Sequence, residues 1–385
     1  MKPLNIALVR QRYTAFGGAE RFVERAMQAL NAQGAQMTIV TRSWPGNGHH
    51  RALICNPLHL GNVWRDWSFA RCVCRTLQEQ DFDLVQSHER IACCDVYRAG
   101  DGVHREWLRQ RQRTLGALGK LGVALNPYHR YMLAAEKKLF SATRLKAVIC
   151  ISHMVKKDIQ RHYAVPEEKL HVIYNGVDTS AFHPSLAERH RQPVREVFGI
   201  PPDALLFLFV GSGFERKGLA ILLQALATQA ENTHLLVVGK DKRMQNFRRA
   251  AVRLGLGARV HFAGGQADVL PFYGAADAMA FPTLYEPFGN VVLEAMASGL
   301  PVITSSKSGA AELIEHGKNG YICDALDAAA LSASMARLTV PGAAATMGAA
   351  ARVTAESYTL ETMGERLVRL YHSLLLDSGA AADQG

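Results

Sequence analysis

Short apolar runs alternate with helix-like segments along almost the whole chain, and this alternation constrains the fold more than any other feature. The first half predicts a helix over 18–33 and strands over 5–10, 36–41, 84–87 and 147–151. After Pro201-Pro202 the alternation starts again, with helices expected over 217–229 and 247–254 and strands over 205–210, 233–239, 260–263, 278–282 and 301–304. Parallel strands need crossovers and usually bury both faces, so the pattern predicts an α/β fold with two doubly wound parallel sheets.

The length of 385 residues suits two domains. Residues 189–202 contain three prolines and several charges, so we interpret them as a linker. The first domain is then expected over 1–188 and the second over 189–357. A last helix, over 360–376 within the segment 358–377, is expected to return and pack on the first domain. The tail 377–385 is small and polar and is expected to fray.

Composition excludes several classes of protein. Hydrophobic residues make up 48% and charged residues 20%, which excludes a disordered chain. No apolar run is long enough to span a bilayer, and the first ten residues predict a strand instead of a signal peptide. The seven cysteines are scattered and lack zinc-site spacing, so we expect buried thiols in a reducing cytosol.

Much of the net charge of +10 lies in one segment, 104–146, which holds ten Lys and Arg residues and only two Glu. Leucine and aromatic residues stand between these cations. Such a pattern is typical of a segment that lies on an anionic membrane surface, which we favour as its partner. A solvated or substrate-facing basic patch is one alternative. Nucleic acid is another, but no helix-turn-helix, zinc-finger or aromatic RNA-binding signature is present, so no nucleic-acid partner is expected.

Two loops at expected strand ends carry phosphate-binding features, because open parallel sheets bind ligands where strands lead into helices. Gly17 and Gly18 follow the first strand, where paired glycines let backbone N–H groups approach a phosphate or sugar. A tight turn is the alternative. Arg216 and Lys217 stand at a helix start, where a diphosphate would meet a guanidinium, an ammonium and the helix dipole. Two solvated side chains would be the plainer explanation.

The loop over 282–301 carries two glutamates. Glu286 lies in the loop, and Glu294 follows one to two turns into the next helix. Backbone donors at the helix start come from Gly289, Asn290 and Val291. Since a carboxylate can accept two sugar hydroxyls, Glu294 suits a ribose and Glu286 a second, transferable sugar. The loop predicts a nucleotide-linked sugar, against the alternative of a helix cap and a surface charge.

These motifs resemble the retaining glycosyltransferases of family four. Their signature of two glutamates, the second eight positions after the first, matches Glu286 and Glu294. Further matches span almost the whole chain, at 17–21, 175–178, 211–218, 260–264 and 312–320. Within the family, residues 16–18, 95–101, 211–218 and the basic insertion most resemble the lipopolysaccharide core glucosyltransferases that act on heptose. The resemblance implies the GT-B fold, with two Rossmann-like domains facing across a cleft.

The resemblance also implies roles for matching positions. Arg216 and Lys217 would bind the donor diphosphate, and Glu294 the ribose. Glu286, with the backbone of Phe288, Gly289 and Asn290, would hold the donor sugar. The residues implied near the reaction centre and the acceptor are Gly17, Gly18, Asp101 and His88. His88 falls where the subfamily carries another residue type, so a buried or capped histidine is the alternative. Ser308-Gly309 replaces the two glycines of many members, which leaves that loop's donor contacts open.

The implied reaction moves a hexose, expected to be glucose, from a UDP-sugar to a heptose of the lipopolysaccharide inner core. Asp81-Phe82-Asp83 resembles the metal motif of a different glycosyltransferase fold but lies at a strand start. We therefore expect no metal, and no cofactor besides the donor substrate. The expected location is cytoplasmic, peripheral on the inner face of the bacterial inner membrane.

Alternative functions remain open from the sequence. The donor could be UDP-N-acetylglucosamine, UDP-galactose or GDP-mannose, and the acceptor a polysaccharide or a phospholipid. UDP-sugar epimerases and glucan synthases share the two-lobed fold, although the long extra segments of the synthases are missing. A catalytically inactive protein that binds nucleotide sugar or membrane would keep the same fold without turnover.

Overall fold

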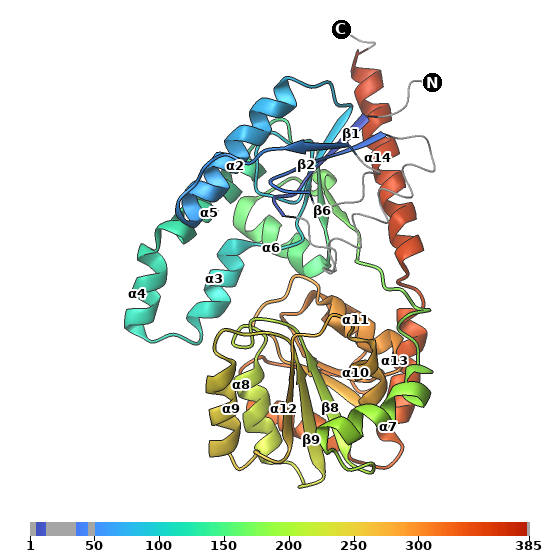
Figure 1. Cartoon of the computed structure of the whole chain (residues 1–385). Coiled ribbons are helices and arrows are strands. Elements are labelled where there is room, and N and C mark those ends of the chain that lie inside the picture. Colours follow the sequence, from blue (N-terminus) through green and yellow to red (C-terminus); the bar gives the residue numbers. More distant parts are fainter. Residues whose placement is uncertain (1–4, 13–35, 45–50, 383–385) are drawn as a thin grey trace. The chain divides into compact units, whose positions relative to one another are not determined.

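The structure, a computed structural model, describes residues 5–12, 36–44 and 51–382 (Figure 1). Two compact units make up the chain, one of Met1–Tyr174 with Leu360–Gly385 and one of Asn175–Thr359. Each contains a parallel sheet with helices packed against it, which confirms the predicted α/β class. The helix expected over 18–33 lies outside the described residues, and so do Gly17 and Gly18.

The first unit is built on a parallel sheet in the order β3-β2-β1-β4-β5-β6-β7. Its described strands are β1 (Asn5–Val9), β2 (Gln36–Thr41), β3 (Arg51–Ile54), β4 (Leu84–Ser87), β5 (Val96–Arg98), β6 (Ala147–Cys150) and β7 (Leu170–Val172). The four predicted strands correspond to β1, β2, β4 and β6. Strands β5 and β7 were not predicted because three residues are too few to show a periodicity. Strand β3 is as long as β4 and β6 but, unlike them, is not an apolar buried run.

Helices of the first unit that the structure describes are α2 (Gly61–Gln78), α3 (His104–Gln112), α4 (Ala117–Leu125), α5 (Pro127–Phe140), α6 (His153–Tyr163) and α14 (Leu360–Ala382). A short 3-10 turn, η1 (Glu167–Lys169), precedes β7. The basic segment 104–146 thus spans α3, α4 and α5, which connect β5 to β6.

Helix α14 packs on the first sheet, as predicted. Met363, Leu367 and Tyr371 join one core cluster with strand residues such as Ile6 and Ile149. The Tyr371 hydroxyl also hydrogen-bonds the buried Gln86 side chain in β4. The expectation of a frayed tail from residue 377 is wrong up to Ala382, because the helix continues through this alanine-containing stretch.

One disulfide, between Cys74 in α2 and Cys93 in the β4–β5 connection, corrects the expectation of thiols throughout. The two Cα atoms lie 5.7 Å apart because the connection runs beneath α2. The free cysteines are Cys55, Cys72, Cys94, Cys150 and Cys323. All but Cys72 are buried, as expected.

The second unit has a parallel sheet in the order β10-β9-β8-β11-β12-β13. Its strands are β8 (Leu205–Val210), β9 (Thr233–Val238), β10 (Val260–Gly264), β11 (Ala278–Phe281), β12 (Val302–Ser305) and β13 (Gly320–Cys323). Its helices are α7 (Leu186–Phe198), α8 (Leu219–Ala227), α9 (Met244–Arg253), α10 (Leu270–Ala275), α11 (Asn290–Ala297), α12 (Ala328–Arg337) and α13 (Ala343–Ala355), with a 3-10 turn, η2 (Gly309–Leu313).

The linker expected over 189–202 is wrong, because most of it forms helix α7, which packs against α10 in the second unit. Arg195 explains this placement. Its buried guanidinium donates to Asp277 Oδ2 at 2.7 Å and to the carbonyl of Ala275 at 3.1 Å. Pro193 lies inside the helix. The compact units divide between Tyr174 and Asn175, upstream of the expected boundary after residue 188.

Candidate active site

Two loops of the second unit meet at the carboxyl ends of the neighbouring strands β8 and β11. The Arg216 carbonyl, in the loop after β8, accepts a 2.8 Å hydrogen bond from the backbone N–H of Leu284, in the loop after β11. Gly218 lies between them with φ 79°, and a Cβ there would fall 1.9 Å from the carbonyl oxygen of Pro282. Only glycine permits this approach, so the sequence Arg-Lys-Gly brings both cations against the second loop.

Glu286 forms ion pairs with both cations of the first loop. The Arg216 Nη1 lies 2.8 Å and the Lys217 Nζ 3.6 Å from Glu286 Oε2. Arg216 also donates to the carbonyl of Tyr285 at 2.9 Å, and Lys217 lies 4.8 Å above the Phe281 ring. The structure therefore brings Glu286 against Arg216, from which it is separated by 70 positions in the sequence, and against the adjacent Lys217.

The protonation states of this cluster follow from its burial and charges. Burial raises the pKa of Glu286, but Lys217 and Arg216 outweigh that effect and hold the pKa below its ordinary value. Burial lowers the pKa of Lys217, and the Glu286 carboxylate offsets this only in part. Two cations thus stand beside the Glu286 carboxylate, an arrangement suited to binding an anion.

Helix α11 contributes the second glutamate and a positive helix end. Gly289, with φ 91°, directly precedes the helix. The free backbone N–H groups at the start of α11 and the positive end of its dipole therefore lie beside the Glu286 loop. Glu294, within α11, accepts a 2.8 Å hydrogen bond from the Tyr273 hydroxyl. At the helix start, the Asn290 side chain accepts one of 2.7 Å from Asn175.

The Ser308-Gly309 loop supports the Glu286 loop. The backbone N–H of Glu286 donates to the Lys307 carbonyl, and that of Gly309 donates to the Glu286 carbonyl, both at 2.9 Å. The Ser308 hydroxyl adds a 3.0 Å hydrogen bond to the Phe288 carbonyl. The serine that replaces a family glycine is thus built into the loop.

His88 and Asp101 belong to the first unit. His88 is buried after β4, and its Nε2 lies 3.1 Å from the Gln86 amide nitrogen. Burial, with Arg98 and Arg10, holds the pKa of His88 well below its ordinary value, so the ring is neutral at neutral pH. Asp101 is exposed, and its carboxylate lies 3.9 Å from Arg90. His88 is therefore a buried histidine, which was the alternative to a role near the acceptor.

Sequence reasoning missed two polar residues. Tyr273 holds Glu294, but nothing in the pattern of α10 distinguishes it from a core aromatic residue. Glu89 follows His88, and its Oε1 accepts a 2.9 Å hydrogen bond from the Gln11 N–H. Burial raises the pKa of Glu89. Its proximity to the end of β1 depends on strand order, which a sequence pattern does not show.

The basic segment is anchored by Glu136 in α5. Its buried carboxylate accepts hydrogen bonds of 2.6 Å from the His104 N–H, at the start of α3, and 2.9 Å from Arg90 Nε. The Tyr163 hydroxyl of α6 adds a third, also 2.6 Å.

In the described part of the chain, no helix combines the length and hydropathy needed to cross a membrane. No group of three or more potential metal ligands occurs there either.

Comparison with known proteins places this geometry in a family. Residues 190–352 match the model for glycosyl transferases group 1, and residues 16–181 match that for Glycosyltransferase Family 4. The lipopolysaccharide glucosyltransferase WaaG of Escherichia coli is 30% identical over 82% of this chain and 84% of its own length. The chain belongs to glycosyltransferase family 4.

Two further comparisons agree with family 4 membership. The lipopolysaccharide core biosynthesis glycosyltransferase LpsE of Rhizobium meliloti is 32% identical over 81% of this chain and 82% of its own length. The crystal structure of WaaG superposes with a TM-score of 0.82 at 27% identity, covering 95% of this chain and 99% of WaaG. These family 4 proteins thus confirm the GT-B fold.

Proposed function

We propose that this family 4 protein transfers a hexose, specifically glucose, from a UDP-sugar to a heptose of the lipopolysaccharide inner core. The configuration of the anomeric carbon is retained. The observation that carries the proposal is the double ion pair of Glu286 with Arg216 and Lys217 at the ends of β8 and β11. The names of WaaG and LpsE, both relatives in lipopolysaccharide biosynthesis, support the acceptor class.

The donor would be held by its diphosphate and its two sugars. Arg216 offers a guanidinium fork and Lys217 an ammonium to the phosphate oxygens. Glu294, held by Tyr273, accepts hydrogen bonds from the ribose hydroxyls. Glu286 and the backbone from Phe288 to Val291 hold the transferred sugar.

The reaction needs no nucleophile from the protein. The acceptor hydroxyl attacks the anomeric carbon on the face from which the diphosphate leaves. The bond from that carbon to the diphosphate oxygen breaks, the bond to the acceptor oxygen forms, and the leaving phosphate takes the proton. Arg216 and Lys217 stabilise the charge that develops on the diphosphate, a contribution worth about 2–4 kcal/mol for a well-placed donor.

Residues of the first unit are proposed to serve the acceptor. His88, as a neutral ring, can exchange hydrogen bonds with a sugar hydroxyl, and Asp101 can accept from one. Gly17 and Gly18, proposed to line the reaction centre, lie outside the described residues.

We propose that the transfer is metal-independent, because the Arg216–Lys217 pair and the α11 dipole already supply positive charge at the diphosphate position. A chelator is therefore expected to leave the initial rate unchanged within twofold. A rate that falls with EDTA and returns with Mg²⁺ or Mn²⁺ would contradict this part of the proposal.

The function is tested by nucleoside diphosphate release from UDP-, GDP- and ADP-sugars, with and without truncated lipopolysaccharide core. We expect release from UDP-glucose that the core stimulates and that Glu294→Ala abolishes. Glu315→Ala, which alters an exposed glutamate of the same unit, serves as the matched control and should retain the rate. Donor binding without turnover of any donor would favour the inactive binding protein instead.

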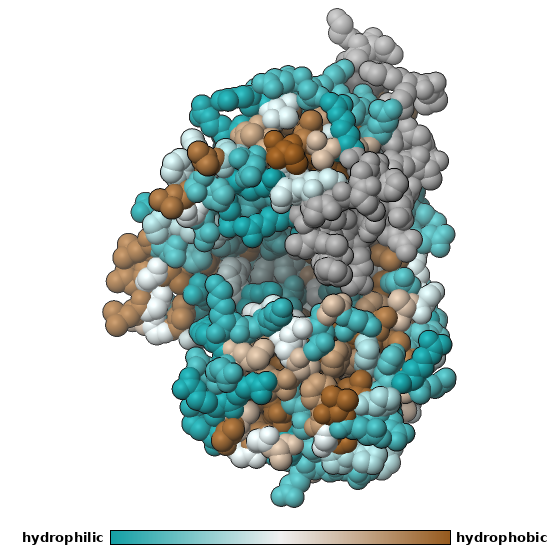
Figure 2. Space-filling model, viewed as in Figure 1, coloured by the Kyte–Doolittle hydropathy of each residue, from teal (hydrophilic) through white to brown (hydrophobic). Residues whose placement is uncertain are grey.

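We further propose that the basic segment places the enzyme on the cytoplasmic face of an anionic membrane. Helix α4 supports this, because Leu118 is 86% and Leu125 62% exposed, with Leu121 between them and also exposed. Figure 2 shows this apolar group over α4. Arg109 and Lys120 supply nearby cations in α3 and α4, and cations beside exposed leucines suit an interfacial helix.

Vesicle co-sedimentation tests this surface. Leu118→Ser with Leu121→Ser is expected to reduce binding to phosphatidylglycerol vesicles at least fivefold. The matched control Val252→Ser with Val353→Ser removes two exposed apolar residues from the second unit and should bind normally. A variant with Arg109, Arg111, Arg113 and Lys120 neutralised should also lose binding. Unchanged binding in both the leucine variant and the charge variant would remove the membrane role from this segment.

A further inference from the structure

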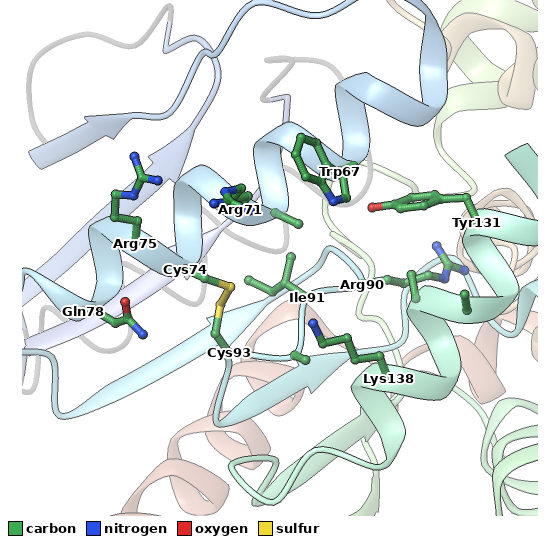
Figure 3. A pocket seen from close by; sticks show the side chains of 14 residues that line it. Trp67, Arg71, Cys74, Arg75, Gln78, Arg90, Ile91, Cys93, Tyr131 and Lys138 are labelled. Atoms are coloured by element: carbon green, nitrogen blue, oxygen red, sulfur yellow. A yellow bond between two sulfur atoms is a disulfide. The ribbon is translucent and has the colours of Figure 1, made fainter.

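A groove lies between α2 and α5 of the first unit, and none of the donor-site residues lines it (Figure 3). It arises from the connection between β4 and β5. Parallel strands are usually joined by a crossover of a dozen or more residues that contains a helix, whereas residues 88–95 cross through bends and a turn, without a helix. The groove opens over this connection and has a volume of about 680 Å³. That volume falls in the range of small-molecule sites.

The floor of the groove is tied in place. Ile91 and Cys93 come from the crossover, and the Cys74–Cys93 disulfide joins it to α2. In Figure 3 the disulfide lies at the floor, and the Lys138 side chain reaches toward it from α5. A fixed floor lowers the ordering cost of binding a ligand.

The lining of the groove is positive. It contains Arg71, Arg75, Arg90 and Lys138 and no carboxylate. Arg90 is already paired with Glu136 and Asp101. Within the described ranges, no carboxylate lies at ion-pair distance from Arg71, Arg75 or Lys138. Arg71 and Arg75 stand one turn apart on α2, where like charges repel, so an anion in the groove would relieve this repulsion.

Aromatic side chains stand at one end of the groove. Trp67 of α2 is 48% exposed, and the Tyr131 hydroxyl of α5 points toward it in Figure 3. The lining also includes small residues such as Ala70 and Ala134. Aromatic faces are negative and attract the C–H bonds of a pyranose ring, and alanines leave room for that ring to lie flat.

We propose that the α2–α5 groove binds an anionic sugar, a pyranose whose phosphate or carboxylate pairs with Arg75 and Lys138 and whose ring packs on Trp67 and Tyr131. The concave shape favours this ligand over a lipid surface, which contacts convex, leucine-bearing elements such as α4. Resting on the proposed function, the sugar is an anionic unit of the acceptor that binds away from the reacting hydroxyl.

Calorimetric titration of the full chain in saturating UDP tests the groove directly. Glucose 6-phosphate and glucuronate are the probes, and glucose and inorganic phosphate are the comparisons. Binding of one or both anionic sugars is expected to be at least tenfold tighter than that of glucose or phosphate. The two probes distinguish a sugar phosphate from a sugar acid.

Variants connect this binding to the groove. Arg75→Gln with Lys138→Gln is expected to weaken it at least tenfold, and Ala134→Trp, which fills the groove, should do the same without changing charge. The control Lys137→Gln with Lys157→Gln removes two exposed cations of the same unit and should stay within twofold. Equal binding by wild type and both groove variants, or binding of phosphatidylglycerol vesicles but not of sugars through Arg75 and Lys138, would overturn the proposal.

Kinetics separate this inference from the proposed function. In the transferase assay the Arg75→Gln, Lys138→Gln variant should raise the acceptor KM about tenfold and leave kcat and the donor KM unchanged. Groove binding without any transfer would refute the proposed function and leave the groove site standing. Transfer with an unchanged acceptor KM would refute the acceptor assignment of the groove.

Discussion

Replacing Lys217 with methionine gives the sharpest test of the donor site, because it removes one charge and keeps nearly the same shape. In the wild-type cluster Arg216 and Lys217 pair with Glu286, at distances of 2.8 and 3.6 Å. Without Lys217 the cluster loses one of its two positive charges. A unit charge about 4 Å away is worth about 4 kcal/mol at an effective dielectric constant of about 20. Because 1.36 kcal/mol corresponds to tenfold, kcat should fall about a thousandfold.

The loss should appear chiefly in kcat, since the diphosphate gains charge as the sugar leaves, whereas donor KM should rise less. Acceptor-dependent UDP release at saturating donor measures both constants. Lys242→Met, which removes an exposed lysine of the same unit, is the control and should retain wild-type kcat. A fall in kcat of less than threefold for Lys217→Met, with the fold intact, would refute the assignment of leaving-group stabilisation to this lysine.

Three further predictions concern other parts of the chain. Reducing the Cys74–Cys93 bond, or replacing both cysteines with serine, should lower the unfolding free energy of the first unit by about 3 kcal/mol, because the bond closes a loop with a sequence separation of 19. Urea unfolding monitored by tryptophan fluorescence measures this loss of stability, since all four tryptophans lie in that unit. An unchanged unfolding midpoint would contradict the prediction. Burial lowers the pKa of His104 to about 4 in the folded chain. As the pH falls, His104 of the unfolded chain therefore binds a proton first, and the unfolding free energy should fall below about pH 6.5. His104→Gln should flatten the dependence of that free energy on pH between about pH 6.5 and 5, and identical slopes for wild type and variant would count against this prediction. Tyr273→Phe removes the 2.8 Å hydrogen bond to Glu294. Because such a hydrogen bond contributes about 1 kcal/mol, the donor KM should rise about threefold to tenfold, with kcat unchanged. An altered kcat with a normal donor KM would assign Tyr273 another role.

Strand periodicity predicted much of the fold, and the errors have identifiable causes. The linker prediction failed because Pro193 and several charges are typical of exposed loops, whereas Arg195 finds a buried partner in Asp277 that is distant in sequence. The cysteine prediction failed for a related reason. Nothing local to Cys74 or Cys93 shows that the β4–β5 connection passes beneath α2.

The candidate site likewise contains residues that the sequence could predict and residues that it could not. Loop motifs predicted Arg216, Lys217, Glu286 and Glu294, because glycines and helix starts after apolar runs are local features of the chain. The roles assigned to these residues remain predictions. Tyr273 and the groove between α2 and α5 could not be predicted, because each depends on which elements become neighbours.

By itself, the sequence determined the α/β class, the two sheets, the family and the loops that carry charge, because hydrophobic periodicity and turn chemistry are written over short stretches of chain. Only the tertiary structure decided that Glu286 pairs with both Arg216 and Lys217, that His88 is buried and neutral, and that a positive groove opens over residues 88–95. Ion pairing, burial and cavities depend on distances between residues far apart in sequence, and those distances are fixed when the strands take their order and the helices pack on them.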